Sequence, residues 1–89
     1  MVELAMDAED EFGIALPDTA LQDIATVGAF YDVIVPLVRA NGAAELRVRD
    51  DLEQYLWSRV RVLAARPSAG VAPEHISRST RFVEDLGYG

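Results

Sequence analysis

Apolar residues recur at helical spacing in three long segments, residues 2–12, 27–40 and 46–65. Positions three and four apart lie on one side of a helix, so this pattern predicts three amphipathic helices. The apolar stripes are Leu4, Ala8 and Phe12 in the first, Val27, Phe30, Tyr31, Ile34, Leu37 and Val38 in the second, and Val48, Leu52, Tyr55, Leu56, Val60 and Leu63 in the third. No segment shows the strict alternation that predicts a strand.

Local signals predict where these helices begin and end. Gly13 suits the position just after the first helix, where a left-handed backbone conformation is common. Thr26 is a favourable N-cap for the second helix. Pro36 lies inside the second helix, which we therefore expect to kink or end early. Asn41-Gly42 predicts a linker that ends at about residue 45, before the third helix.

The remaining segments are short or irregular. Pro17-Asp18 opens a short helix over residues 18–23, and residues 70–89 read mostly as loop, with a single turn at 73–76. The expected fold is all-α: a small bundle of three main helices plus one short helix and a long loop. A chain of 89 residues is long enough for one small domain, residues 1–89.

Charge is distributed unevenly along the chain, which carries a net charge of −7. Within residues 1–38 every charged side chain is an acid, whereas residues 46–89 contain seven Arg and six acids. The early acids are Glu3, Asp7, Glu9, Asp10, Glu11, Asp18, Asp23 and Asp32. An acidic face repels nucleic acid and anionic membranes and suits a basic patch on a protein partner. The alternative is a solvated surface that only aids solubility.

Candidate chemistry is sparse. His75 is the only histidine and lies in the expected loop, and cysteine is absent, so neither a catalytic triad nor a metal centre is indicated. The acids at 7–11 fail the EF-hand pattern, because Phe12 stands where that loop needs glycine. No apolar run approaches the roughly 18 residues of a membrane span. The N-terminus also lacks a signal-peptide pattern, so we expect a cytoplasmic protein. Because candidate catalytic residues are sparse, we expect a protein that is not an enzyme.

Two stretches resemble acyl carrier proteins. Residues 2–18 (VELAMDAEDEFGIALPD), followed by 24–28 (IATVG), are similar to the family's second helix, the loop after it and the start of the last helix. Residues 70–87 (GVAPEHISRSTRFVEDLG) are similar to the end of the first helix and the long loop that follows. The string FVEDLG at 82–87 is among the more specific family signatures. The resemblance covers nearly the whole chain and implies the family's helical bundle.

The segment order is that of a circular permutant. Residues 1–40 resemble family helices two to four, and residues 46–89 resemble helix one and its following loop, which come first in the family. In the family's bundle the first helix runs antiparallel to the second and last, so a short linker can join them. Gly89 takes the place of the Asp in the family's Asp-Ser-Leu signature. The serine that carries phosphopantetheine would fall between Gly89 and Met1 and is absent, so no cofactor is expected.

The resemblance also implies a partner surface. Acyl carrier proteins present the acids of the second helix to basic patches on acyl-handling enzymes of fatty-acid or polyketide-type metabolism. Such charges speed and steer docking. The residues that match this recognition helix are Val2, Glu3, Met6, Glu9 and Asp10. An acyl-carrier-like docking protein is therefore implied, whereas the carrier role does not follow without the serine.

Four alternatives stay open at this point. The chain could be a non-carrier interaction module that uses the same bundle and acidic helix. It could be a fragment or permutant of a longer or tandem carrier protein, whether natural or engineered. Two copies could also complete each other as a domain-swapped homodimer. An enzyme ranks last, because only His75 offers a general base near neutral pH.

Overall fold

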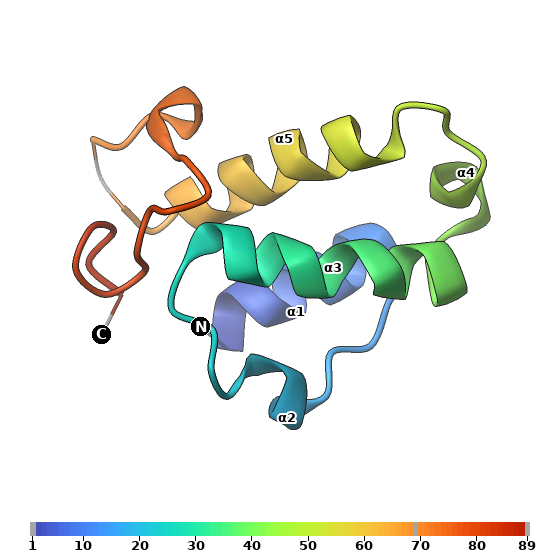
Figure 1. Ribbon diagram of the computed structural model, residues 1–89, viewed down its shortest axis with the longest axis horizontal. Coiled ribbons are helices and arrows are strands. Elements are labelled where there is room, and N and C mark those ends of the chain that lie inside the picture. The colour runs from blue at the N-terminus through green and yellow to red at the C-terminus, as the bar shows by residue number, and fades with distance from the viewer. Residues whose placement is uncertain (1, 69, 89) are drawn as a thin grey trace.

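The computed structural model describes residues 2–68 and 70–88, and its architecture is all-α (Figure 1). The elements in chain order are α1 (Val2–Phe12), α2 (Asp18–Leu21), α3 (Val27–Asn41), α4 (Ala44–Arg47), α5 (Leu52–Ala65) and a 3₁₀ turn η1 (Pro73–His75). The expected helical bundle with a long C-terminal loop is confirmed. A second short helix, α4, was not expected.

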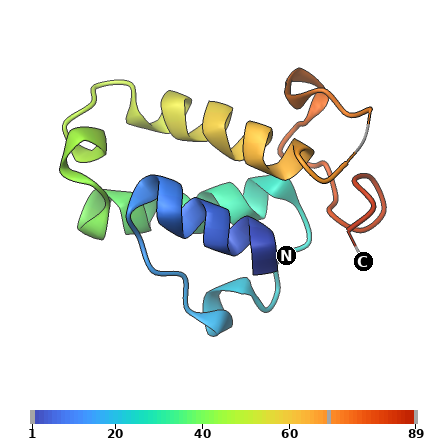
Figure 2. The ribbon, with the colours of Figure 1, turned by 180° about the vertical axis from the view of Figure 1, so that it is seen from behind.

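The three long helices define the arrangement. α1 and α3 run in the same direction, and α5 runs in the opposite direction across them (Figures 1 and 2). α2 lies in the connection between α1 and α3, whereas α4 lies at the turn from α3 into α5. The loop after α5 covers the end of the bundle where α1 and α3 begin. The first and last described residues therefore lie at the same end of the molecule.

Both capping predictions are confirmed. Gly13 has a φ of +67°, which a residue with a side chain adopts only at a cost, and its N–H donates to the Glu9 carbonyl at 2.9 Å. The Thr26 hydroxyl accepts a hydrogen bond from the Ala29 N–H at 3.2 Å. These contacts satisfy backbone groups that a helix end leaves without partners.

Of the two effects expected of Pro36, an early end of the helix is wrong, because α3 continues to Asn41 with Pro36 inside it. The kink stays a prediction. Pro36 is exposed, so the carbonyl that loses its helical partner can be solvated. Ile34 and Val38 on the opposite side are fully buried. Their packing outweighs the one lost hydrogen bond.

The long helix expected over 46–65 is in fact two helices, with α4 ending at Arg47 and α5 beginning at Leu52. Leu46 is buried, whereas Val48 is 79% exposed and does not belong to the apolar stripe. The Arg49 side chain donates a hydrogen bond of 2.9 Å to the carboxylate of Asp51, the residue immediately before α5. The linker after Asn41 is accordingly shorter than expected, and the short helix expected over 18–23 ends at Leu21.

The C-terminal loop is fixed to the start of α3. The Val27 and Gly28 N–H groups donate to the carbonyls of Thr80 (2.9 Å) and Arg78 (3.0 Å), and the Phe82 N–H donates to Ala25 (3.0 Å). A Cβ on Gly28 would lie 2.7 Å from the Arg78 carbonyl oxygen, so only glycine permits this approach. The largest fully buried side chains include Phe12, Phe30 and Phe82, from α1, α3 and the loop. The loop therefore contributes to the same core as the helices.

Candidate functional site

The five residues implied by the resemblance lie together on one face of α1. At about 100° per residue, Val2, Glu3, Met6, Glu9 and Asp10 span an arc of about 120°. The buried residues of α1 lie on the opposite face and are Leu4, Ala5, Ala8 and Phe12. Val2 is 73% exposed and Met6 is 56% exposed. Figure 2 shows α1 in front of the other long helices, and the face that turns away from them is the one that a partner could reach.

Glu9 differs from the other four residues because it also supports the fold. Its carboxylate accepts a hydrogen bond from the Leu16 N–H at 2.7 Å, and its side chain is half-buried. This contact holds the extended segment between α1 and α2 against the helix. We assign Glu9 a structural contribution beside its predicted partner role, which leaves Val2, Glu3, Met6 and Asp10 as the exposed members.

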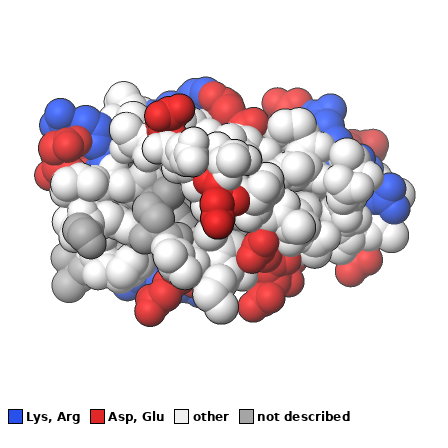
Figure 3. Space-filling view, turned by 90° about the horizontal axis from the view of Figure 1, so that it is seen from below, with Lys and Arg blue, Asp and Glu red and all other residues white. Residues whose placement is uncertain are grey.

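The acids of this face are not neutralised by nearby arginines. Among residues 2–68 and 70–88, the ion pairs do not involve Glu3 or Asp10. Glu11, outside the arc, pairs with Arg59 through two hydrogen bonds of 2.5 and 3.0 Å. Figure 3 shows the α2 side of the molecule, where acids lie across the face and basic residues lie mainly toward its margins. The negative charge of Glu3 and Asp10 is thus available to a partner.

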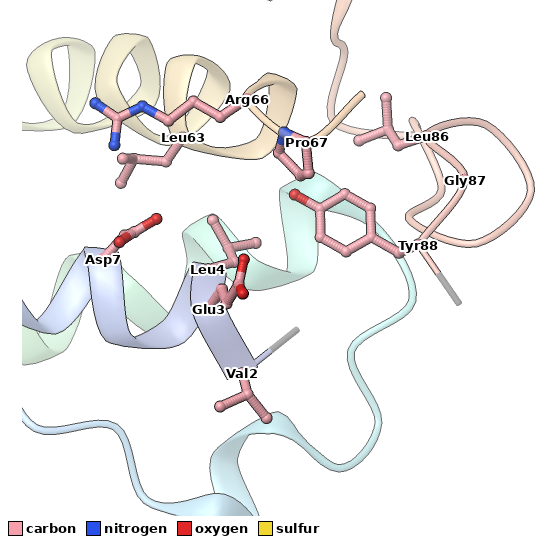
Figure 4. A pocket seen from close by; sticks show the side chains of 10 residues that line it. All are labelled: Val2, Glu3, Leu4, Asp7, Leu63, Arg66, Pro67, Leu86, Gly87 and Tyr88. Atoms are coloured by element: carbon pink, nitrogen blue, oxygen red, sulfur yellow. The ribbon is translucent and has the colours of Figure 1, made fainter. Parts of the chain in front are cut away.

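An open pocket of about 640 Å³ adjoins the start of this face. Its apolar wall includes Leu4 from α1, Leu63 from α5 and Leu86 from the loop (Figure 4). The polar lining residues are Glu3, Asp7, Arg66 and Tyr88. Sequence reasoning missed this pocket, because three segments far apart in the chain form it.

Tyr88 is held firmly in the pocket wall. Its hydroxyl donates to the Ala64 carbonyl at 2.8 Å, and its ring packs edge-on against Phe82 with centroids 5.0 Å apart. Burial, with a smaller contribution from the negative charge of Asp7, raises the pKa of Tyr88 to about 12. The phenol is therefore neutral at ordinary pH and serves as a hydrogen-bond donor.

Replacing Tyr88 by phenylalanine should lower the free energy of unfolding by about 1 kcal/mol at pH 7, because one hydrogen bond is lost. The ordinary tyrosine pKa is about 10, so in the wild type this stabilisation is complete below about pH 10 and is lost as pH rises toward the folded value near 12. Urea unfolding of both proteins at several pH values between about 7 and about 11.5 tests this, because the difference in unfolding free energy should shrink at the upper end of that range. A stability difference that stays constant to high pH would contradict the assignment.

His75 is exposed in η1, and the described residues contain no group of three side chains suited to hold a metal ion. Within those same residues, no helix combines the length and apolar character needed to cross a bilayer. The junction predicted to lack the phosphopantetheine serine involves Met1 and Gly89, which lie outside the described residues.

No family model, curated protein or solved structure matches this chain.

Proposed function

We propose that this chain is an acyl-carrier-like docking protein without catalytic activity, whose α1 face binds a basic patch on an acyl-handling enzyme. The observation that carries the proposal is the composition of that face. Val2 and Met6 are exposed one helical turn apart, and the exposed acids Glu3 and Asp10 lie on the same face. An apolar centre beside acids that join no ion pair within residues 2–68 and 70–88 is typical of protein interfaces steered by electrostatics.

The arrangement of the chain gives the proposal further support. α5 runs antiparallel to α1 and α3 (Figure 1), as a permuted acyl carrier bundle requires. Val2 and Tyr88, at the two ends of the described chain, line the same pocket. A permutant opened at the prosthetic-group junction would have its ends in such a place.

Binding to a purified phosphopantetheinyl transferase with a basic carrier-docking surface tests the proposal. Titration calorimetry at low and high salt should give an affinity that falls as salt rises, because exposed charges are screened. The absence of binding at low salt, or an affinity that salt does not change, would contradict docking through the acidic face.

Intact mass after incubation with coenzyme A and the same transferase separates docking from carrying. We expect a folded sample to keep its mass, since the serine of the family signature is absent from the sequence. A gain of one phosphopantetheine would instead mean that another serine is used and that the chain is a carrier. The molecular mass measured by sedimentation of the same sample tests whether the chain forms a domain-swapped homodimer. The homodimer and the cytoplasmic location both stay predictions.

A further inference from the structure

The pocket beside the α1 face joins an apolar wall to a mostly acidic lining. Leu4, Leu63 and Leu86 supply aliphatic surface. Among the lining residues that the structure describes, Glu3 and Asp7 supply two carboxylates and Arg66 supplies one cation. In Figure 4 the Asp7 carboxylate points from α1 toward α5, and Arg66 extends along α5 away from Tyr88. The part of the pocket near Glu3 and Tyr88 is therefore the more negative part.

The pocket is also continuous with the α1 face, because Val2 and Glu3 belong to both. A partner that covers Val2 and Met6 would reach the pocket mouth without any rearrangement of the chain. The volume of about 640 Å³ lies well within the range of ligand pockets and exceeds what one side chain needs. The wall around Tyr88 is fixed by its bond to Ala64 and by Phe82, so the partner would meet a preformed site.

We propose that this pocket receives an arginine side chain of the docking partner. Its aliphatic stem would pack on the leucines, as long basic side chains commonly do, while the guanidinium meets the Glu3 carboxylate and the Tyr88 ring. Arginine fits better than lysine, because a planar guanidinium can pair with a carboxylate and stack on an aromatic ring together. Anchors of this kind, buried at one point of an interface, carry a large share of binding energy. The inference rests on the docking function proposed above.

The test uses n-butylguanidinium, which reproduces the arginine side chain with its α-carbon as a methyl group. Added to the ¹⁵N-labelled full chain, it should shift the amide signals of Leu4 and Gly87 saturably at millimolar concentration, while Leu46 in α4 stays unchanged. Two controls separate the components of the ligand. Pentanoate carries the same butyl group on a carboxylate, and guanidinium has the charge without the stem; both should shift these signals much less.

Variants identify the charges involved. Glu3→Gln combined with Asp7→Asn should weaken n-butylguanidinium binding by about fivefold or more. Asp18→Asn combined with Asp23→Asn removes the same charge from the α2 region and should leave binding unchanged. Absence of saturable shifts at the pocket, equal shifts with pentanoate, or equal weakening by both pairs of variants would each overturn the proposal. If the probe fails while the transferase still binds in a salt-dependent way, the docking function stands and only the arginine pocket is wrong.

Discussion

Replacing Phe82 by alanine is expected to lower the free energy of unfolding by about 3–5 kcal/mol. Phe82 is 2% exposed and packs edge-on against Phe30, with ring centroids 6.1 Å apart, and against Tyr88 at 5.0 Å. Its removal would leave a cavity between α3 and the C-terminal loop, which has few other large buried side chains. A small domain has a total stability of only about 5–15 kcal/mol, so the variant should lose a large fraction of it.

Val83 provides the matched control for this prediction, because it is the next residue in the same loop and is 62% exposed. Val83→Ala should change the unfolding free energy by less than about 0.5 kcal/mol. Urea unfolding followed by circular dichroism compares the two variants with the wild type. Similar midpoints for Phe82→Ala and Val83→Ala would mean that the loop does not share the core of the bundle.

Reversing the two exposed acids of α1 is the second change with a large expected effect. Glu3→Lys combined with Asp10→Lys should weaken binding to a basic carrier-docking enzyme by about thirtyfold at low salt, because attraction becomes repulsion at two sites. Both residues lie opposite the buried face of α1, so the fold should be retained. Titration calorimetry measures the affinity, and circular dichroism confirms the helical content.

The control must change the net charge equally at another place. Asp18→Lys combined with Asp23→Lys does so around α2, where both side chains are exposed. This pair should weaken binding only slightly. An equal loss of affinity for the two pairs would mean that the partner responds to overall charge rather than to the α1 face.

Much of the fold follows from helical periodicity and capping. α1 ends where Gly13 stands, and α3 begins after Thr26, because these residues satisfy local geometric needs. Pro36 and the break before α5 could not be predicted in the same way. Continuation through Pro36 depends on which side of α3 faces solvent, and the break depends on whether Leu46 or Val48 enters the core. Both are decided by tertiary packing rather than by local sequence.

The candidate site was predictable to a similar degree. Helical spacing alone places Val2, Glu3, Met6 and Asp10 on one face. The bond between Glu9 and the Leu16 N–H could not be foreseen, because it depends on how the chain turns after Gly13. The pocket needs the start of α1, the end of α5 and the last described residues to meet, and no local signal encodes that meeting.

The most direct test of the proposed docking surface is an NMR titration of the ¹⁵N-labelled chain with an unlabelled phosphopantetheinyl transferase. If the α1 face is the docking surface, amide signals of α1 between Val2 and Asp10 shift or broaden most, while those of α4 and the start of α5 change little. If the largest changes fall on α4 and α5, or if no signal changes at low salt, the α1 face is not the docking surface.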